Sequence, residues 1–176
     1  MIETPRLLLR SWQPGDGDAF AAMNAHPEVM ADLGGPLDRA TSDAKLARFT
    51  KSFADRGLTR WLIEDRATGR YLGYCGLAWH DTHALGPHHD IGWRLTRDAW
   101  GKGYAFEAAT AALADAFTRA GINEVFAYTA PDNLRSQAVM ARLGLERLSD
   151  RDFIWPEGEG AWHGLVWVAR TNLPAM

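Results

Sequence analysis

Several common features are scarce in this sequence. Its 176 residues include one cysteine, Cys75, which excludes an intrachain disulfide and any metal site built from several cysteines. No apolar run approaches the roughly 18 residues of a membrane helix, and the first residues lack the basic and apolar stretches of a signal peptide. Neither charge predominates, since 19 basic and 22 acidic residues give a net charge of -3. We therefore expect a cytoplasmic protein that binds neither membranes nor, through bulk charge, nucleic acid.

The composition is that of one folded domain. Apolar residues make up 47% and charged residues 23% of the chain, values that argue against disorder. The length suits a single domain over residues 1–176. Tryptophan is abundant, at positions 12, 61, 79, 93, 100, 155, 162 and 167. Packing accounts for most such side chains, although several of these could line a cleft.

Hydrophobic periodicity and turn residues predict alternating strands and helices. Strands are expected at residues 6–12, 60–65, 71–79, 89–95, 124–129, 146–155 and 162–170. Helices are expected from Asp16 or Asp18 and at residues 41–56, 104–120 and 134–143. Hairpins followed by strand–helix–strand units favour a mixed α/β (α+β) fold, with a mostly antiparallel central sheet flanked by helices.

The strongest chemical signal is the segment Trp100-Gly101-Lys102-Gly103-Tyr104-Ala105, between a strand and a long helix. Two glycines at a helix start leave backbone N–H groups unobstructed, and together with the helix dipole these suit a phosphate or pyrophosphate. A plain glycine-rich connection is the alternative. A Walker A loop does not fit because Gly103 follows Lys102, and a dinucleotide fingerprint does not fit because Phe106 stands where a third glycine is needed.

Four motifs follow one another along the chain. They are Asp90-Ile91-Gly92-Trp93-Arg94-Leu95, the glycine segment with Glu107-Ala108, Asn133-Leu134-Arg135-Ser136, and Arg142-Leu143-Gly144-Leu145. Together they resemble the GNAT superfamily of acyl-CoA-dependent N-acyltransferases, and the opening Glu3-Thr4-Pro5-Arg6-Leu7-Leu8-Leu9-Arg10 resembles its RimJ/RimL-type branch. The resemblance implies transfer of an acetyl group from acetyl-CoA to a primary amine, on a small molecule or a protein N-terminus.

The resemblance also implies which residues hold coenzyme A. Backbone N–H groups of the glycine segment would bind the pyrophosphate; its members are Trp100, Gly101, Lys102, Gly103, Tyr104 and Ala105. Leu95 would hold the pantetheine arm through its backbone, and Asn133 and Ser136 form the family's Asn-x-x-Ser pair. Asn133 could instead be a plain helix N-cap, and Arg142 could reach the nucleotide phosphates or lie on a solvated face.

Catalytic groups follow from the same resemblance. Asp90 matches the acidic strand residue that some family members use as a base, although a structural or substrate-orienting role is an alternative. Met140 occupies the position of the usual tyrosine acid, which leaves Ser136 as the best remaining hydroxyl and Tyr104 or Tyr128 as substitutes. An acid could also be dispensable, because a CoA thiolate is a tolerable leaving group.

Four histidines lie close together in the sequence. An expected polar loop at residues 81–88 contains His83 and His88 and is flanked by His80 and His89. Metal ligands sit on regular elements with fixed spacing, so we interpret these histidines as solvated loop residues and expect no metal. One of them could contact the substrate or act as an auxiliary base.

The amine that accepts the acetyl group is expected on the side of the cleft opposite the phosphate-binding loop, beside Trp79, Trp155 and Trp162. Four acidic residues near these tryptophans would form a rim: Asp81, Asp152, Glu157 and Glu159. An aromatic wall with an acidic rim suits a cationic amine rather than an anionic acceptor. The same tryptophans could instead pack in the core or form a homodimer contact.

Two other functions fit parts of the pattern. A non-catalytic, CoA-binding regulatory domain could use the same fold, since fold alone does not settle activity. Asp90 beside an intact glycine loop favours an enzyme. A nucleotide-binding oxidoreductase is disfavoured by the missing third glycine.

Overall fold

A computed structural model describes residues 1–157 and 160–171. The strands are β1 (Ile2–Glu3), β2 (Leu7–Arg10), β3 (Arg60–Asp65), β4 (Tyr71–His80), β5 (His88–Leu95), β6 (Glu124–Thr129), β7 (Glu146–Arg147), β8 (Phe153–Glu157) and β9 (Gly160–Arg170). The helices are α1 (Gly17–Asn24), α2 (Pro27–Met30), α3 (Arg39–Arg56), α4 (Tyr104–Thr118) and α5 (Leu134–Arg142). Glu159 and the side chain of Glu157, two members of the expected acidic rim, lie outside the described residues.

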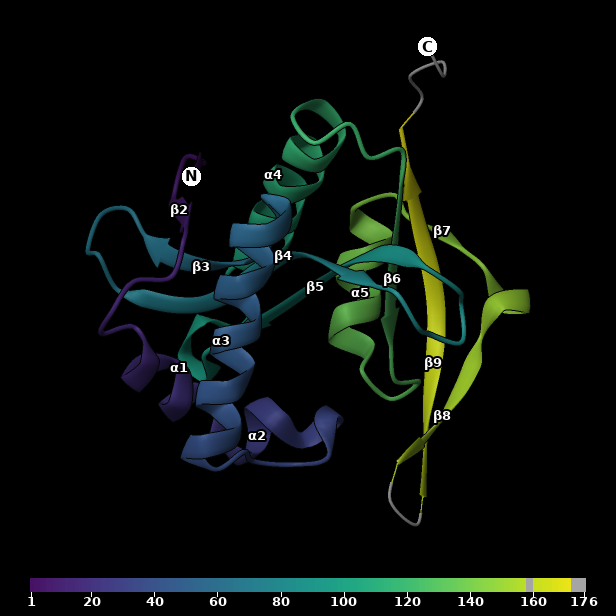
Figure 1. Ribbon diagram of the computed structural model, residues 1–176, viewed down its shortest axis with the longest axis horizontal. Coiled ribbons are helices and arrows are strands. Elements are labelled where there is room, and N and C mark those ends of the chain that lie inside the picture. Colours follow the sequence, from purple (N-terminus) through teal and green to yellow (C-terminus); the bar gives the residue numbers. More distant parts are fainter. Residues whose placement is uncertain (158–159, 172–176) are drawn as a thin grey trace.

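One sheet runs through the molecule in the order β1-β2-β3-β4-β5-β6-β9-β7, and β8 pairs with β9 (Figure 1). Every neighbouring pair is antiparallel except β5 and β6, which are parallel and share a single pair, Asp90 with Phe126. The predicted mixed α/β fold with a mostly antiparallel sheet is therefore confirmed.

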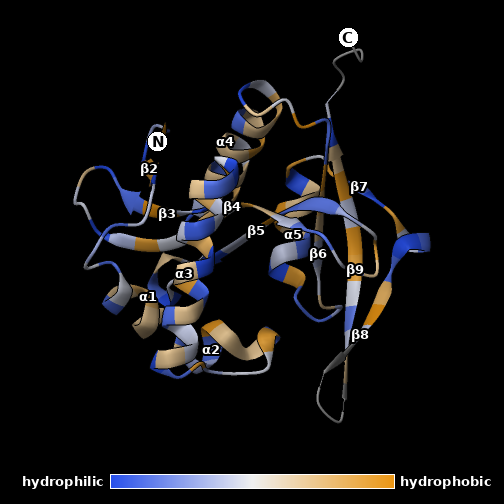
Figure 2. Ribbon diagram, in the orientation of Figure 1, coloured by the Kyte–Doolittle hydropathy of each residue, from blue (hydrophilic) through white to orange (hydrophobic). Residues whose placement is uncertain are grey.

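Helices cover both faces of the sheet, and strand alternation decides which side chains meet them. Cys75 and Leu77 of β4 belong to the main core, together with Ala108 and Ala112 of α4. Tyr74 points to the opposite face, where a second core contains α1, α2 and part of α3. Figure 2 shows the hydrophobic residues of β9, whose buried Val166 and Val168 form a third core cluster with Phe126 of β6.

The elements differ from the expected ones mainly at their ends. The first strand is shorter than expected, and a two-residue strand, β1, precedes it. Helix α2 was not predicted; it is a single helical turn that starts at Pro27, where a proline is tolerated. The expected strand at residues 146–155 is divided into β7 and β8 by a 3₁₀ turn, Ser149–Arg151. Within the described ranges, no helix has the length and hydropathy to cross a membrane.

Candidate active site

The glycine loop has the conformation that a free row of backbone donors requires. Gly101 and Gly103 have φ angles of 72° and 79°, in the left-handed region that favours glycine. Gly103 is the N-cap of α4 and provides no side chain there, so the first N–H groups of the helix lack a side-chain cap. The helix start therefore presents donors and a positive dipole end to the adjoining cavity.

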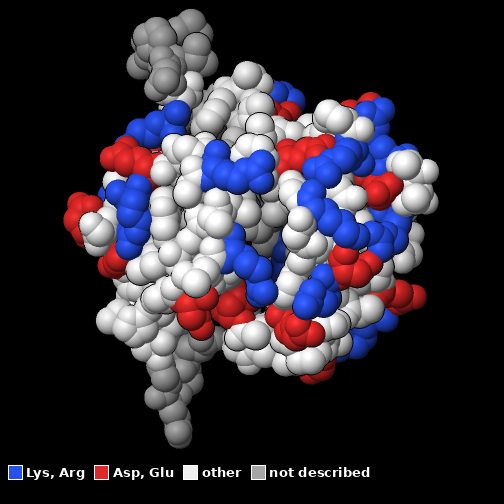
Figure 3. Space-filling model, turned by 180° about the vertical axis from the view of Figure 1, so that it is seen from behind, with Lys and Arg blue, Asp and Glu red and all other residues white. Residues whose placement is uncertain are grey.

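That cavity has a volume of about 360 Å³ and separates the carboxyl end of β5 from α5. The predicted coenzyme A residues that line it are Leu95, Trp100, Gly101, Gly103, Tyr104, Ala105, Asn133, Ser136 and Arg142. Lys102 is the one predicted loop residue that is not part of the lining. Arg94 and Arg135 add to the positive charge of the wall, and Figure 3 shows basic side chains around the hollowed centre of this face.

Trp100 fixes the junction between β5 and the loop. Its indole Nε1 donates a hydrogen bond of 3.1 Å to the carbonyl of Leu95. Guanidinium groups approach the ring, with Arg135 Cζ at 3.8 Å and Arg97 Cζ at 4.7 Å from the centroid. The tryptophan thus orients the backbone at Leu95 and holds two cations near the loop.

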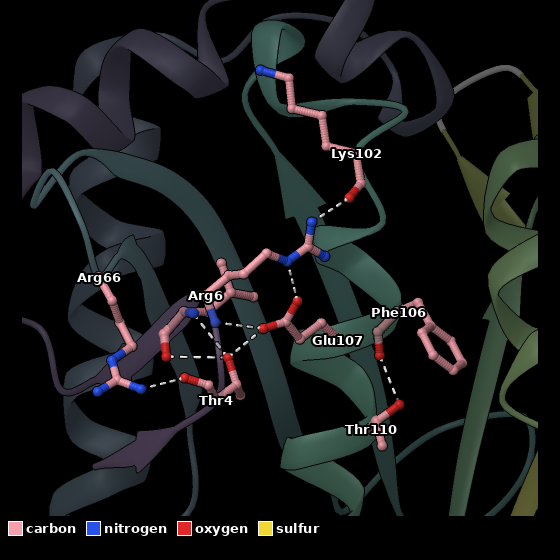
Figure 4. Close-up of polar contacts among 8 residues, drawn as sticks. Thr4, Arg6, Arg66, Lys102, Phe106, Glu107 and Thr110 are labelled. Carbon is pink, nitrogen blue, oxygen red and sulfur yellow. Dashed lines mark hydrogen bonds and ion pairs between the residues drawn. The ribbon is translucent and has the colours of Figure 1, made fainter.

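The amino-terminal segment braces the same loop (Figure 4). Arg6 donates to the Glu107 carboxylate at 2.6 Å through Nε and to the Lys102 carbonyl at 2.9 Å through Nη1. Thr4 donates its hydroxyl proton to Glu107 at 2.6 Å. Burial would raise the pKa of Glu107, but hydrogen bonds from Thr4 and Arg6 lower it below the usual value. Sequence reasoning missed this brace, although both ends of it lie in motifs that carried the family resemblance.

Asn133 is the N-cap of α5 and also contacts Asp32. Its Oδ1 accepts a hydrogen bond of 3.1 Å from the backbone N–H of Ser136, which caps α5. Its Nδ2 donates to Asp32 at 2.7 Å. Asp32 also pairs with Arg94 at 2.8 Å, and this pairing outweighs burial and lowers the pKa of the carboxyl. Asp32 and Arg94 were not predicted as site residues.

Asp90 lies in a buried ion pair rather than at a cavity wall. Its Oδ2 accepts from Arg60 at 2.5 Å and its Oδ1 contacts His80 Nε2 at 2.9 Å. Burial alone would raise the pKa of this carboxyl, but the Arg60 charge and the His80 hydrogen bond lower it to about 2. Such a carboxylate is a weak base, and both of its oxygens are occupied.

Glycine at position 92 makes room for this pair. A Cβ atom there would lie 3.1 Å from Arg60 Cζ. Arg60 comes from β3, and its guanidinium also donates to the backbone carbonyl of Gly76 on β4. Gly76 and Gly92 are cross-strand partners, so the guanidinium crosses the sheet over two positions without side chains.

A second cavity of about 150 Å³ lies next to the first. Four residues line both cavities: Asp32, Trp93, Arg94 and Ser136. The rest of the smaller cavity is formed by Leu33, Arg60, Tyr74, Ile91, Gly92, Tyr128, Thr129, Met140 and Trp162. Met140, at the family's tyrosine position, and Tyr128 therefore face the same space.

Of the three tryptophans expected at the acceptor, Trp162 alone lines this cavity. Trp79 is opposite His89 in the sheet register, one position from Ala78 and Asp90, so it lies on the other face. Trp155 is 44% exposed on β8, beside the exposed Ile154. The homodimer contact suggested for this hairpin stays a prediction.

The sequence analysis expected the four histidines to be solvated loop residues, but three of them lie on β4 and β5 and all four are buried or partly buried. The strands extend to His80 and His88, and ring stacking organises the turn between them. His83 lies between Tyr128 and Trp155, 5.2 Å from each ring centroid. Burial and neighbouring histidines lower the pKa of His83 to about 4, so its ring is neutral near pH 7. No group of three or more metal-binding side chains occurs among the described residues.

Comparisons with known proteins agree with this geometry. A family model described as acetyltransferase (GNAT) domain matches residues 6–146. The uncharacterized N-acetyltransferase YoaA of Bacillus subtilis is 28% identical over 155 residues, which cover 84% of this chain and 83% of that protein. The acetyltransferase from Agrobacterium tumefaciens has a TM-score of 0.81 at 26% identity, over 97% of this chain and 94% of that one.

A more distant structure contains ligands. The spermidine N-acetyltransferase from Vibrio cholerae, solved with CoA and spermine, has a TM-score of 0.73 at 16% identity, over 95% of this chain and 96% of that one. At this identity the likeness concerns the fold. The family match at residues 6–146 includes the glycine loop, Asp90 and α5, and it leaves out β8 and β9.

Proposed function

Because the chain belongs to the GNAT acetyltransferase family and is an N-acetyltransferase that uses acetyl-CoA, we propose that it acetylates a primary amine by direct attack in a ternary complex. We place it in the RimJ/RimL-type branch and assign this activity to a single domain. The observation that carries the proposal is the 360 Å³ cavity, which joins a helix start with free backbone donors to a wall of arginines. Such a cavity suits a phosphorylated donor.

The larger cavity is assigned to the acyl donor. The N–H groups from Trp100 to Ala105 bind the pyrophosphate, and Arg142 reaches the nucleotide phosphates. Leu95, oriented by the Trp100 indole, aligns the pantetheine arm beside Asn133 and Ser136. This arrangement brings the thioester toward the residues that both cavities share, where the acceptor can meet it.

The reaction requires one bond to form and one to break. The neutral amine attacks the thioester carbonyl, a C–N bond forms, and the C–S bond breaks to release the CoA thiolate. One amine proton is lost and one proton ends on the sulfur, so the exchange needs no other reactant. Approximation of the two substrates supplies most of the acceleration.

We assign the acceptance of the amine proton to His80, with Asp90 as its positioning residue. A carboxylate with a pKa of about 2 cannot compete for this proton, whereas an imidazole is suited to the task. His80 Nε2 donates a hydrogen bond of 2.9 Å to the Asp90 carboxylate, which orients the ring. Because Nε2 donates to Asp90, Nδ1 is the nitrogen that accepts the amine proton. The Tyr128 hydroxyl, 3.3 Å from Nε2, connects His80 to the lining of the smaller cavity.

We assign to Ser136 the hydrogen bond that stabilises the leaving CoA thiolate. Its position in the lining of both cavities places it where donor and acceptor meet. Met140 has no proton to give, and burial raises the pKa of Tyr128 far above its usual value, which makes that phenol a poor acid. Ser136 needs only to donate a hydrogen bond to the sulfur, because the thiolate is a tolerable leaving group.

The test is thiol release from acetyl-CoA with a panel of primary amines. We expect release with at least one amine, and His80→Gln should lower kcat/KM on the order of 100-fold or more while leaving acetyl-CoA affinity unchanged. His89→Gln is the matched control, since His89 lies on the opposite face of the same strands.

Equal losses in the two variants would remove His80 from the mechanism. Tight acetyl-CoA binding without turnover of any amine would instead support the non-catalytic, CoA-binding alternative.

A further inference from the structure

Two residues that line the smaller cavity carry a side-chain donor that no described residue satisfies. Arg94 Nε and Trp162 Nε1 are buried, and neither has a hydrogen-bond partner among residues 1–157 and 160–171. Both residues line this cavity. Each atom can only donate, and a buried donor without a partner is destabilising. Two such donors on side chains that line one cavity favour an occupant that brings oxygen acceptors.

The charges around the cavity favour an occupant that carries a negative charge. Burial would raise the pKa of the Tyr74 hydroxyl, but the charges of Lys45, Arg94 and Arg60 hold it below its usual value. Lys45 Nζ lies 5.4 Å from the centroid of the Tyr74 ring, so a third cation stands behind this wall.

The nearby carboxylates do not balance these three cations. Asp32 is paired with Arg94 and Asp90 with Arg60, so each is already neutralised by a guanidinium. The charge of Lys45 is left in excess. A carboxylate is attracted to such a site, whereas a polycation is repelled.

The size of the cavity restricts what it can hold. Its volume of about 150 Å³ is below the roughly 300–1,000 Å³ of sites for drug-sized ligands, so it suits a small acceptor group. The amino and carboxylate groups of an amino acid, with the α-carbon between them, form such a group. The residues shared with the larger cavity then place the amine beside the thioester.

We propose that the acceptor is a small aminocarboxylate, of the α-amino acid type, whose carboxylate is received by Arg94 Nε and Trp162 Nε1. This inference rests on the proposed N-acetyltransferase activity and specifies its substrate class. It reverses the expectation of a cationic acceptor, because Arg60 and Arg94 line the cavity and Asp32, the acidic residue of its described lining, is paired with Arg94.

The test compares amines that differ in one charge. Thiol release from acetyl-CoA is measured with neutral L-amino acids, with the corresponding amino acid amides and with spermidine. We expect kcat/KM to be at least about tenfold higher for the acids than for their amides, the effect of one hydrogen-bonded charge. Equal rates for acids and amides, or a preference for spermidine, would overturn the proposal.

A variant locates the carboxylate. Trp162→Phe removes the Nε1 donor and keeps an aromatic ring, so it should raise the acceptor KM about tenfold for the acids. The KM for the amides and the affinity for acetyl-CoA should not change. Trp167→Phe is the control, since Trp167 lies on the same strand and lines neither cavity. A KM for the acids that responds equally to both variants would contradict the assignment.

A binding measurement separates this inference from the proposed activity. N-acetyl amino acids are titrated into the CoA-loaded protein by calorimetry, with N-acetyl amino acid amides as the control. Weaker binding of the amides, and loss of the difference in Trp162→Phe, would support the carboxylate site even if no amine were turned over. Absence of any difference would overturn the site, whatever the outcome of the activity assay.

Discussion

The buried pair Arg60–Asp90 should behave very differently when it is broken and when it is replaced. The side chains are 11% and 6% exposed, and the two charged atoms are 2.5 Å apart. Removing one partner leaves the other charge buried, which costs about 3–5 kcal/mol. We therefore expect Arg60→Met or Asp90→Asn alone to lower the free energy of unfolding by about that amount.

The double variant Arg60→Met/Asp90→Asn leaves neither charge unpaired. Since replacing both members of a buried pair is often nearly neutral, we expect it to be more stable than either single variant. Urea unfolding followed by the fluorescence of the eight tryptophans measures all three. Lys51→Met is the control, because Lys51 pairs with Asp55 on the surface and should cost less than about 0.5 kcal/mol.

The pH dependence gives an independent measurement of the same pair. The pKa of Asp90 falls from 3.8 to about 2 on folding, so the carboxylate contributes on the order of 2 kcal/mol at neutral pH. Because the folded pKa is the lower one, this contribution is complete above about pH 4 and is lost as the pH falls toward 2. Stability should therefore fall more steeply in this range for the wild type than for the double variant.

Two results would refute this reasoning. The first is a cost below about 1 kcal/mol for Arg60→Met, which would mean that water reaches the carboxylate. The second is a double variant whose loss equals the sum of the single losses, since that would show that the two residues do not interact.

The acyl-donor site yields two further predictions. Gly103→Val should weaken acetyl-CoA binding at least about tenfold in calorimetry, because a β-branched residue is strained at φ 79° and its side chain obstructs the donors. Gly121→Val, at φ 66° beyond the far end of α4, should reduce stability and leave the affinity unchanged; equal losses of affinity would contradict the loop assignment. Glu107→Gln should raise the Kd for acetyl-CoA about threefold to tenfold, because it weakens the charged hydrogen bond from Arg6 that braces the loop; an unchanged Kd would show that the brace is dispensable.

The parts of the fold that sequence predicted best are those with strong local signals. The strands at residues 60–65 and 124–129 were predicted with their observed ends, since turn residues and alternation mark both of them. The two-residue strand β1 and the single turn α2 are too short to show a period. β7 and β8 were merged because the 3₁₀ turn between them has no glycine or proline to mark it.

The proposed donor site could be formulated from sequence for the same reason. Its residues from Trp100 to Ala105 are contiguous, and the contacts proposed for them come from the backbone of a glycine loop. The smaller cavity, to which we assign the acceptor, combines residues from β3, β4, β5, β6, α5, β9 and the region of Asp32, which only the completed fold brings together. One long-range fact, the sheet register, decides which of these side chains share a face.

That register also decides where Trp79 and Arg60 lie. Ala78 pairs with Asp90, so the face that holds the Arg60–Asp90 pair includes every second residue from there and excludes Trp79. On that face Gly76 and Gly92 stand opposite each other and leave a channel that a long side chain from the next strand can cross. Glycines at matched positions of a predicted hairpin are visible in a sequence. In this chain such a pair lies two positions from Asp90, and a cation from the neighbouring strand reaches the carboxylate across it. Matched glycines near an acidic strand residue are therefore a reason to consider an ion pair before that residue is assigned as a base.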